Sequence, residues 1–184
     1  HTVPVGEEAA VSSWGKVKIG EIKTGANFKA PWETYDSYNL QSRTYRIANA
    51  GIAAQDKFKN AMTVEYTGRF LRGSADKIRS TTGTADIFLN THVHPTVRSC
   101  MVKAGLTQET SQDFFAETAQ VEMSEYVMAC TNEYLSSAKV GGGYEVAKVQ
   151  FSDINLDARV EKFMVKTKER LEAEEQQNSD ARIA

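Results

Sequence analysis

The clearest hydrophobic pattern in the chain is an alternation over residues 63–72. Val64, Tyr66, Gly68 and Phe70 fall on one face of an extended segment, and polar or charged residues fall on the other. A period of two with one apolar face is typical of a strand in an antiparallel sheet that has one buried and one solvated side. Weaker patterns of the same kind predict further strands at residues 8–14, 17–23, 35–47 and 144–151.

Between residues 74 and 137 the apolar positions change to the three-and-four spacing of helices. Ser74 is placed to cap a short helix, and Thr84 to cap a second one. Pro95 either kinks this second helix or starts a new one. One long helix is expected over residues 110–137. The inner face of the second helix is expected to carry Ile87, Phe88, Val93, Val97, Cys100 and Met101.

The terminal segment, residues 155–177, contains no glycine or proline and is rich in charged helix formers. Asp153 is its expected N-cap. The apolar residues of this segment form one narrow stripe along the expected helix. Such a stripe needs a partner, which is either the preceding domain or a second copy of the chain. The pattern therefore leaves two interpretations open, an ordinary amphipathic terminal helix and the first turns of a coiled coil. The apolar stripe of this helix consists of Leu156, Val160, Phe163, Thr167 and Leu171.

The order of these elements predicts the α+β class, because the strands and the helices are segregated along the chain. We expect an N-terminal antiparallel sheet, then helices and one further strand, in a domain over residues 1–154. A long charged C-terminal helix over residues 155–184 is expected to start a coiled coil. A chain of 184 residues, of which 41% are hydrophobic and 25% charged, is long enough to bury a core of its own.

Charge and hydropathy exclude some classes of function. The net charge of −2 gives no electrostatic reason to expect nucleic acid as a partner. No run approaches the roughly 20 apolar residues that a membrane-spanning helix needs, and no signal peptide is visible. The chain begins at His1 and stops within a helical pattern, so we expect it to be a soluble piece of a longer protein.

Few residues could carry chemistry. Cys100 and Cys130 lie far apart without a CxxC partner, which predicts two reduced core thiols and indicates a reducing compartment. His92 and His94 form the one histidine cluster, but positions two apart on a helix point to different sides, and a third ligand is not evident. We find no nucleophile elbow and no phosphate-binding glycine loop. No catalytic residue, metal or cofactor is therefore predicted.

Four short motifs follow one another in the first quarter of the chain. They are residues 6–11 (GEEAAV), 14–16 (WGK), 24–32 (TGANFKAPW) and 43–44 (RT). In this order they resemble the SPFH domain, also called the band 7 or prohibitin homology domain, which stomatins, prohibitins, flotillins and HflK/HflC share. The later order of strand, helices, strand and charged helix is also similar. The FxxPW stretch and the arginine after it are most similar to prohibitin or HflC-like members.

The resemblance implies a non-enzymatic, membrane-associated scaffold that forms homo-oligomeric rings or cages, organises membrane microdomains and modulates membrane AAA+ proteases. The apolar stripe would then be the oligomerisation surface. Phe28 and Trp32 are candidate membrane-proximal anchors, with two core aromatics as the alternative explanation. The resemblance also implies a contact with membrane lipid through an N-terminal segment that is absent from this chain. The alternative function is a monomeric or dimeric regulatory module that docks a membrane protease or channel.

Overall fold

The alternating segment forms β7 (Asn60–Phe70), the central strand of a three-stranded antiparallel sheet. Its neighbours are β6 (Arg43–Ile52) and β8 (Tyr144–Asn155), in the order β6-β7-β8. The structure is a computed structural model that describes residues 1–183, with the side chains of residues 1–178. The expected inner face of β7 is buried, so the prediction of a half-buried strand is confirmed.

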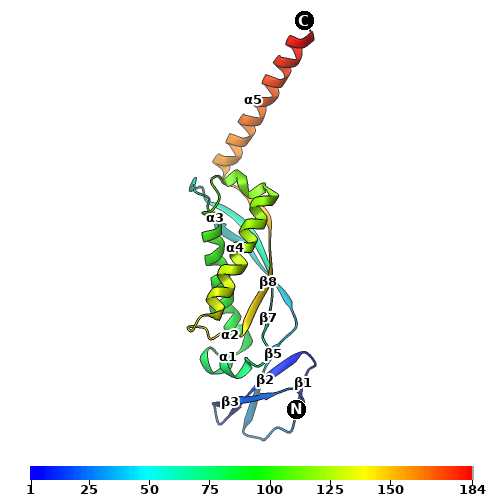
Figure 1. The fold of residues 1–184 in the computed structure, drawn as a ribbon, viewed down its shortest axis with the longest axis vertical. Coiled ribbons are helices and arrows are strands. Elements are labelled where there is room, and N and C mark those ends of the chain that lie inside the picture. The colour runs from blue at the N-terminus through cyan, green and yellow to red at the C-terminus, as the bar shows by residue number, and fades with distance from the viewer. Residues whose placement is uncertain (184) are drawn as a thin grey trace.

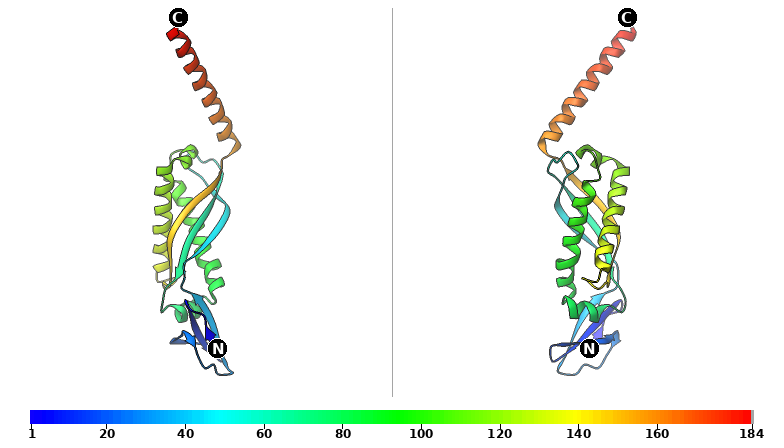
Figure 2. Two further views of the ribbon diagram at one scale, coloured as in Figure 1. Left: turned by 90° about the vertical axis from the view of Figure 1, so that its right-hand side faces the viewer. Right: turned by 60° about the vertical axis from the view of Figure 1, so that its left-hand side comes forward.

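Two helices, α3 (His94–Gly105) and α4 (Glu117–Ser136), cover one face of this sheet (Figures 1 and 2). Their inward side chains complete a single apolar core with the inner face of β7. The α+β class is therefore confirmed. The largest fully buried side chains of this core are Tyr38, Tyr66, Phe88, Phe114, Met62, Ile78, Met101 and Met123.

The helix expected after Thr84 consists of three pieces, α2 (Ala85–Phe88), a π-helical turn η1 (Leu89–Val93) and α3. Pro95 stands in the first turn of α3, where its missing N–H leaves no bond unmade. Five of the six expected inner residues are buried, and only Ile87 is exposed. The extra residue of the π turn explains this error, because it rotates the later positions relative to the earlier ones.

The single helix expected over residues 110–137 is wrong. A 3₁₀ turn, η2 (Ser111–Phe115), is separated from α4 by Ala116, whose backbone is extended with ψ 128°. Thr110 and Asp113 form a capping box that closes the short turn on itself. Asp56 also accepts hydrogen bonds from the Ser111 N–H and hydroxyl, at 2.6 and 2.9 Å. These contacts anchor the turn to the preceding loop and prevent a continuous helix.

The sequence predicted a single N-terminal sheet. The N-terminal strands instead form sheets of their own, which do not join the main sheet. A second antiparallel sheet has the order β3-β2-β5, and β1 (Thr2–Val3) pairs with β4 (Gly25–Ala26) in a short ribbon. The strand expected over residues 35–47 is thereby divided between the two sheets. The three strands of the second sheet are β2 (Glu7–Ser13), β3 (Lys16–Lys23) and β5 (Glu33–Asn39).

The break between β5 and β6 has a local cause. The Asn39 side-chain oxygen accepts a hydrogen bond from the Gln41 N–H at 2.8 Å, which turns the chain. The Leu40 N–H donates to the Gly6 carbonyl at 2.8 Å. Gly6 has φ +85°, a left-handed conformation that favours glycine, and its nearest neighbour is the flexible end of the Gln41 side chain.

The short helix α1 (Ala75–Thr81) joins the two sheets. Asp76 accepts a hydrogen bond from the Gly20 N–H of β3 at 2.6 Å, and Arg79 pairs with Asp36 of β5 at 2.6 Å. Ser74 precedes α1 as expected, but its hydroxyl donates to the Leu71 carbonyl and makes no cap. The N-terminal sheet consequently lies at the end of the molecule opposite the terminal helix (Figure 1).

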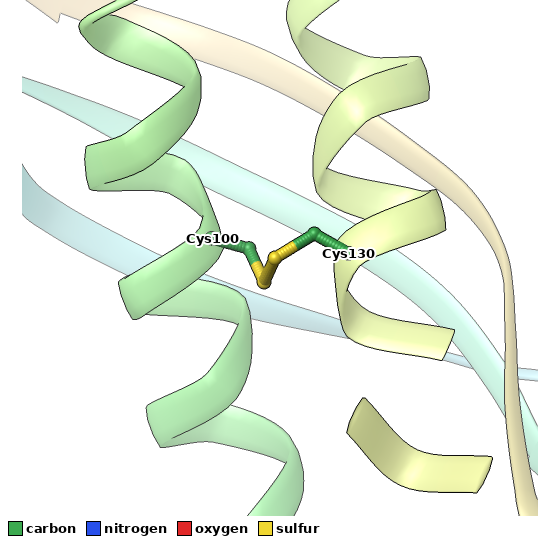
Figure 3. The surroundings of a disulfide bond; sticks show 2 residues. All are labelled: Cys100 and Cys130. Atoms are coloured by element: carbon green, nitrogen blue, oxygen red, sulfur yellow. A yellow bond between two sulfur atoms is a disulfide. The ribbon is translucent and has the colours of Figure 1, made fainter. Parts of the chain in front are cut away.

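A disulfide joins Cys100 of α3 to Cys130 of α4, with the two Cα atoms 5.9 Å apart (Figure 3). The prediction of two reduced thiols is therefore wrong, and the inference of a reducing compartment falls with it, because disulfides persist in oxidising compartments. The sequence could not show the pairing, since it arises only when both helices lie on the same sheet at the same height.

The predicted faces of β8 are wrong, because the strand contains a bulge. The register shifts between the pairs Lys148–Thr67 and Val146–Gly68, which adds one residue to β8. Tyr144, Val146 and Val149 are consequently all buried, whereas the alternation had placed Val149 on the opposite face from the other two.

The terminal helix α5 (Ala158–Ile183) begins later than expected. Asp153 is not its cap, because it lies within β8 with φ +49°. Asp157 precedes the helix, and its side chain accepts a hydrogen bond from the Arg159 N–H at 2.9 Å. The Asp157 N–H donates to the Asn60 side chain at 2.9 Å, which ties the start of α5 to β7.

Candidate functional site

The groups that could carry chemistry are separated in the structure. Within the described side chains, no three His, Cys, Asp or Glu residues converge as metal ligands would. His92 Nε2 lies 3.2 Å from the Thr82 hydroxyl, and His94 Nδ1 lies 2.9 Å from the Tyr66 hydroxyl. The two histidines therefore have different partners on different sides of the helix, and the structure does not bring them together.

The largest exposed aromatic side chains lie on the N-terminal sheet. Trp14, Phe28 and Trp32, which we call the aromatic tip, are 81%, 93% and 51% exposed. Trp14 follows β2 at the turn into β3, and the other two lie in the loop before β5. Ser13 pairs with Glu33, so both tryptophans are at the same end of the sheet. Because β5 leads from that end to the main sheet, the aromatic tip is at the far end of the molecule.

The two tryptophans support each other. Their rings are stacked with the centroids 6.3 Å apart and the planes inclined by 5°, and the Trp14 N–H donates to the Trp32 carbonyl at 3.3 Å. Trp14 has φ +52°, a left-handed conformation that is rare for a bulky residue. An outlier of this kind is a reason to suspect a functional constraint, because Asn or Gly would occupy the turn with less strain.

The loop that carries Phe28 is held by its backbone. The Tyr35 hydroxyl donates to the Phe28 carbonyl at 3.1 Å, and the Ala30 N–H donates to the Glu33 carboxylate at 3.3 Å. Lys29 lies 5.9 Å above the Tyr35 ring. The loop thus presents the Phe28 ring to solvent from a fixed backbone, with a cation beside it. The alternative that Phe28 and Trp32 are core aromatics is wrong.

The predicted stripe of α5 divides into two parts. Leu156 precedes the helix and packs against the main core, and Val160 is buried. Thr167 is partly buried, whereas Phe163 and Leu171 are 64% and 50% exposed. The structure therefore brings Leu156 and Val160 together with the domain, and it leaves the later positions on the surface of the helix that projects from it (Figure 2).

The sequence analysis identified Phe28 and Trp32 but did not relate Trp14 to them. The available signal was the Trp14-Gly15 pair between two strand patterns, since the two central residues of a tight hairpin turn are exposed. The Trp14 side chain was therefore to be expected at the turn between two strands rather than on a face of the sheet.

Comparisons with known proteins complete this description. Residues 1–184 match the family model described as SPFH domain / Band 7 family. No curated protein sequence matches the chain. Within the part of the chain that the structure describes, no helix combines the length and the apolar character that crossing a bilayer requires.

Proposed function

The chain belongs to the SPFH / Band 7 family, and on this premise we propose that it is a non-enzymatic scaffold of the prohibitin or stomatin type at a membrane surface. In this proposal, copies assemble into rings or cages that organise membrane microdomains and modulate membrane AAA+ proteases. The nearest members are prohibitin or HflC-like. Residues 1–154 form the membrane-proximal domain, and residues 155–184 begin the coiled coil that extends the assembly.

The observation that carries the proposal is the placement of the aromatic tip opposite α5. Trp14, Phe28 and Trp32 expose three large rings at one end of the molecule, and Lys16 and Lys29 are exposed beside them. Tryptophan favours the boundary between lipid headgroups and acyl chains, and lysine favours the headgroups. The aromatic tip therefore fits contact with a membrane surface, while α5 projects away from it (Figure 1).

The assembly surface that we propose is the outer part of the α5 stripe. Leu156 and Val160 are already covered within one chain, so they fix the base of the helix. Phe163, Thr167 and Leu171 recur at steps of four and remain available to a second copy. Ion pairs within the helix, Lys168–Glu172 and Arg170–Glu174, lie at i,i+4 spacing and support the helix without using the stripe.

The disulfide indicates the kind of compartment in which the domain lies. A cross-link between Cys100 and Cys130 is stable where thiols are oxidised. We therefore place the domain on the side of its membrane that faces an oxidising compartment.

Assembly is tested by measuring mass in solution. Phe163→Asp together with Leu171→Asp is expected to reduce the mass found by light scattering, because two charges would enter the contact. Val165→Asp is the matched control, since Val165 is 56% exposed on the other side of the same helix. If the unmutated protein and both variants have the mass of one or two chains at every concentration, the regulatory-module alternative replaces the scaffold.

Membrane contact is tested by flotation with vesicles. Trp14→Ser together with Phe28→Ser is expected to abolish flotation with vesicles that contain anionic lipid, and Ile19→Ser is the control from an exposed position of β3. The tryptophan emission of the unmutated protein should shift to the blue on binding. Equal flotation of the double variant would refute the role of the aromatic tip but not the assembly through α5.

A further inference from the structure

A groove of about 610 Å³ lies between β6 and the helical segment that leads into α3. Arg46, Ile47 and Ala48 line it from the strand, and Asn90, His94 and Arg98 line it from the π turn and α3. It is separate from the aromatic tip and from the α5 stripe. None of its lining residues is acidic.

Two backbone irregularities meet at this groove. The π-helical turn η1 (Leu89–Val93) contributes Asn90. On the opposite wall, β6 has a bulge between Ile47 and Ala50, where Asn49 has φ +51°. Both π turns and β-bulges are common beside binding sites, because each re-aims side chains that a regular element would point elsewhere. Here each contributes to the lining of the groove, Ile47 and Ala48 from the bulged part of β6 and Asn90 from the π turn.

His94 provides a fixed hydrogen-bond donor. Its Nδ1 lies 2.9 Å from the hydroxyl of the fully buried Tyr66, and Tyr45 and Tyr66 both pack edge-on against its ring at 5.7 Å. A buried hydroxyl needs an acceptor, and within the described residues His94 Nδ1 is the one that Tyr66 has. With the Tyr66 hydroxyl assigned as the donor to Nδ1, the imidazole hydrogen lies on Nε2. Burial lowers the pKa of His94, and the nearby Arg98 lowers it further, so the ring is neutral.

The positive charges of the groove are of two kinds. Arg46 is already paired with Asp153 at 2.5 Å and with Glu65 at 3.7 Å. These contacts hold Arg46 in place but compensate its charge. Arg98 is exposed, and within residues 1–178 no carboxylate lies within ion-pairing distance of it. The uncompensated cation of this groove is therefore Arg98.

We propose that the groove binds the phosphate group of a small phosphate monoester through Arg98, Asn90 and His94. The Arg98 guanidinium supplies charge, the Asn90 amide and the His94 Nε2–H supply neutral donors, and the three stand four residues apart along η1 and α3, where all of them line the groove. A guanidinium matches phosphate oxygens in charge and shape. The groove is larger than one phosphate group, and Ile47, Ala48 and Pro95 offer an apolar wall to the organic part of the ligand.

The experiment uses inorganic phosphate and glycerol 3-phosphate as soluble probes. Saturable changes are expected in the NMR signals of the His94 imidazole and of the Asn90 amide, with calorimetry giving the affinity. Arg98→Ala is expected to weaken binding roughly tenfold, the usual effect of one charge-assisted hydrogen bond, and Arg98→Lys to weaken it less. Arg43→Ala is the matched control, because Arg43, on β6, is also an exposed arginine but lines a different pocket.

A second arm separates the possible sources of the phosphate. Vesicles of phosphatidylcholine with phosphatidic acid are compared with phosphatidylcholine alone, using the Trp14→Ser, Phe28→Ser variant, which lacks the two most exposed rings of the aromatic tip. Saturation by glycerol 3-phosphate supports a soluble ligand, and saturation by phosphatidic acid vesicles alone supports a lipid headgroup. The proposal is overturned if neither probe saturates, or if Arg98→Ala and Arg43→Ala bind equally well. Neither outcome affects the assembly through α5.

Discussion

The N-terminal sheet exposes most of its large aromatic side chains, whereas the main core buries them. The main core holds Tyr66 of β7 and Phe88 of α2, both completely buried, and Tyr38 of β5 is the large ring that the N-terminal sheet contributes to it. The middle of β2 buries only the small residues Ala9, Ala10 and Val11, while the large rings of the aromatic tip remain outside. Burial of large side chains is the main source of folding free energy. The comparison teaches that one region supplies stability and the other displays a surface.

The contact between the N-terminal sheet and the rest of the domain depends on hydrogen bonds as well as on apolar packing. Glu8 and Asp76 are buried carboxylates that accept hydrogen bonds from the Gly73 and Gly20 N–H groups, at 2.8 and 2.6 Å. The Tyr38 hydroxyl donates to the Gly83 carbonyl at 2.6 Å. Hydrogen bonds are directional, so they fix the angle of the N-terminal sheet on α1 where a small apolar contact would allow it to slide.

The largest effect is expected from truncating a ring in the main core. Phe88→Ala should lower the free energy of unfolding by about 3–5 kcal/mol, because it loses the burial of a full ring and leaves a cavity. Phe28→Ala should lower it by at most about 0.5 kcal/mol, as is usual for an exposed site. Urea unfolding followed by circular dichroism measures both. Similar losses in the two variants would contradict the comparison.

Removing the disulfide is the next largest change. Cys100→Ser together with Cys130→Ser should cost about 3 kcal/mol, because a cross-link between residues 30 positions apart restricts the unfolded chain. Denaturant unfolding with and without a phosphine reductant measures it. Reductant should lower the stability of the unmutated protein and leave that of the double variant unchanged. Rapid labelling of both thiols without reductant would show that the bond is absent.

The sequence predicted elements wherever the signal was local. The period of two over β7 and the start of the second helix after Thr84 needed no knowledge of the rest of the fold. The division of residues 35–47 into β5 and β6 depends on pairing with different sheets, and the Cys100–Cys130 bond depends on two helices lying together. Such non-local choices leave no period in the sequence.

The candidate sites show the same limit. Phe28 and Trp32 were candidate anchors from their residue type and position, but two core aromatics stayed open as the alternative, because a sequence does not show exposure. Trp14 was missed, since its stacking on Trp32 depends on the register of β2 with β5. The groove around His94 was missed as well, because a π turn and a β-bulge each shift the period by one residue and so hide which side chains converge.

A smaller effect is expected at the contact between the N-terminal sheet and the rest of the domain. Asp76→Ala should cost about 1–3 kcal/mol, because the partly buried hydrogen bond from the Gly20 N–H to the charged Asp76 carboxylate is lost. Hydrogen exchange would locate the loss, with faster exchange in β3 and unchanged protection in β7. Asp86→Ala is the control, because Asp86 occupies the same first-turn position of α2 but is exposed. Equal acceleration across β3 and β7 would mean that the two sheets unfold as one unit.

The smallest change in stability is expected at the aromatic tip itself. Trp14→Asn should alter the free energy of unfolding by less than about 1 kcal/mol, because asparagine tolerates the φ of +52° while the stacking on Trp32 is lost. The two effects have opposite signs and similar size. The same variant should nevertheless float poorly with anionic vesicles, since the most exposed tryptophan is gone. A variant that keeps its stability and loses its lipid contact would demonstrate that the strained turn serves the surface and not the fold, whereas a loss of several kcal/mol would assign Trp14 to the core of the N-terminal sheet.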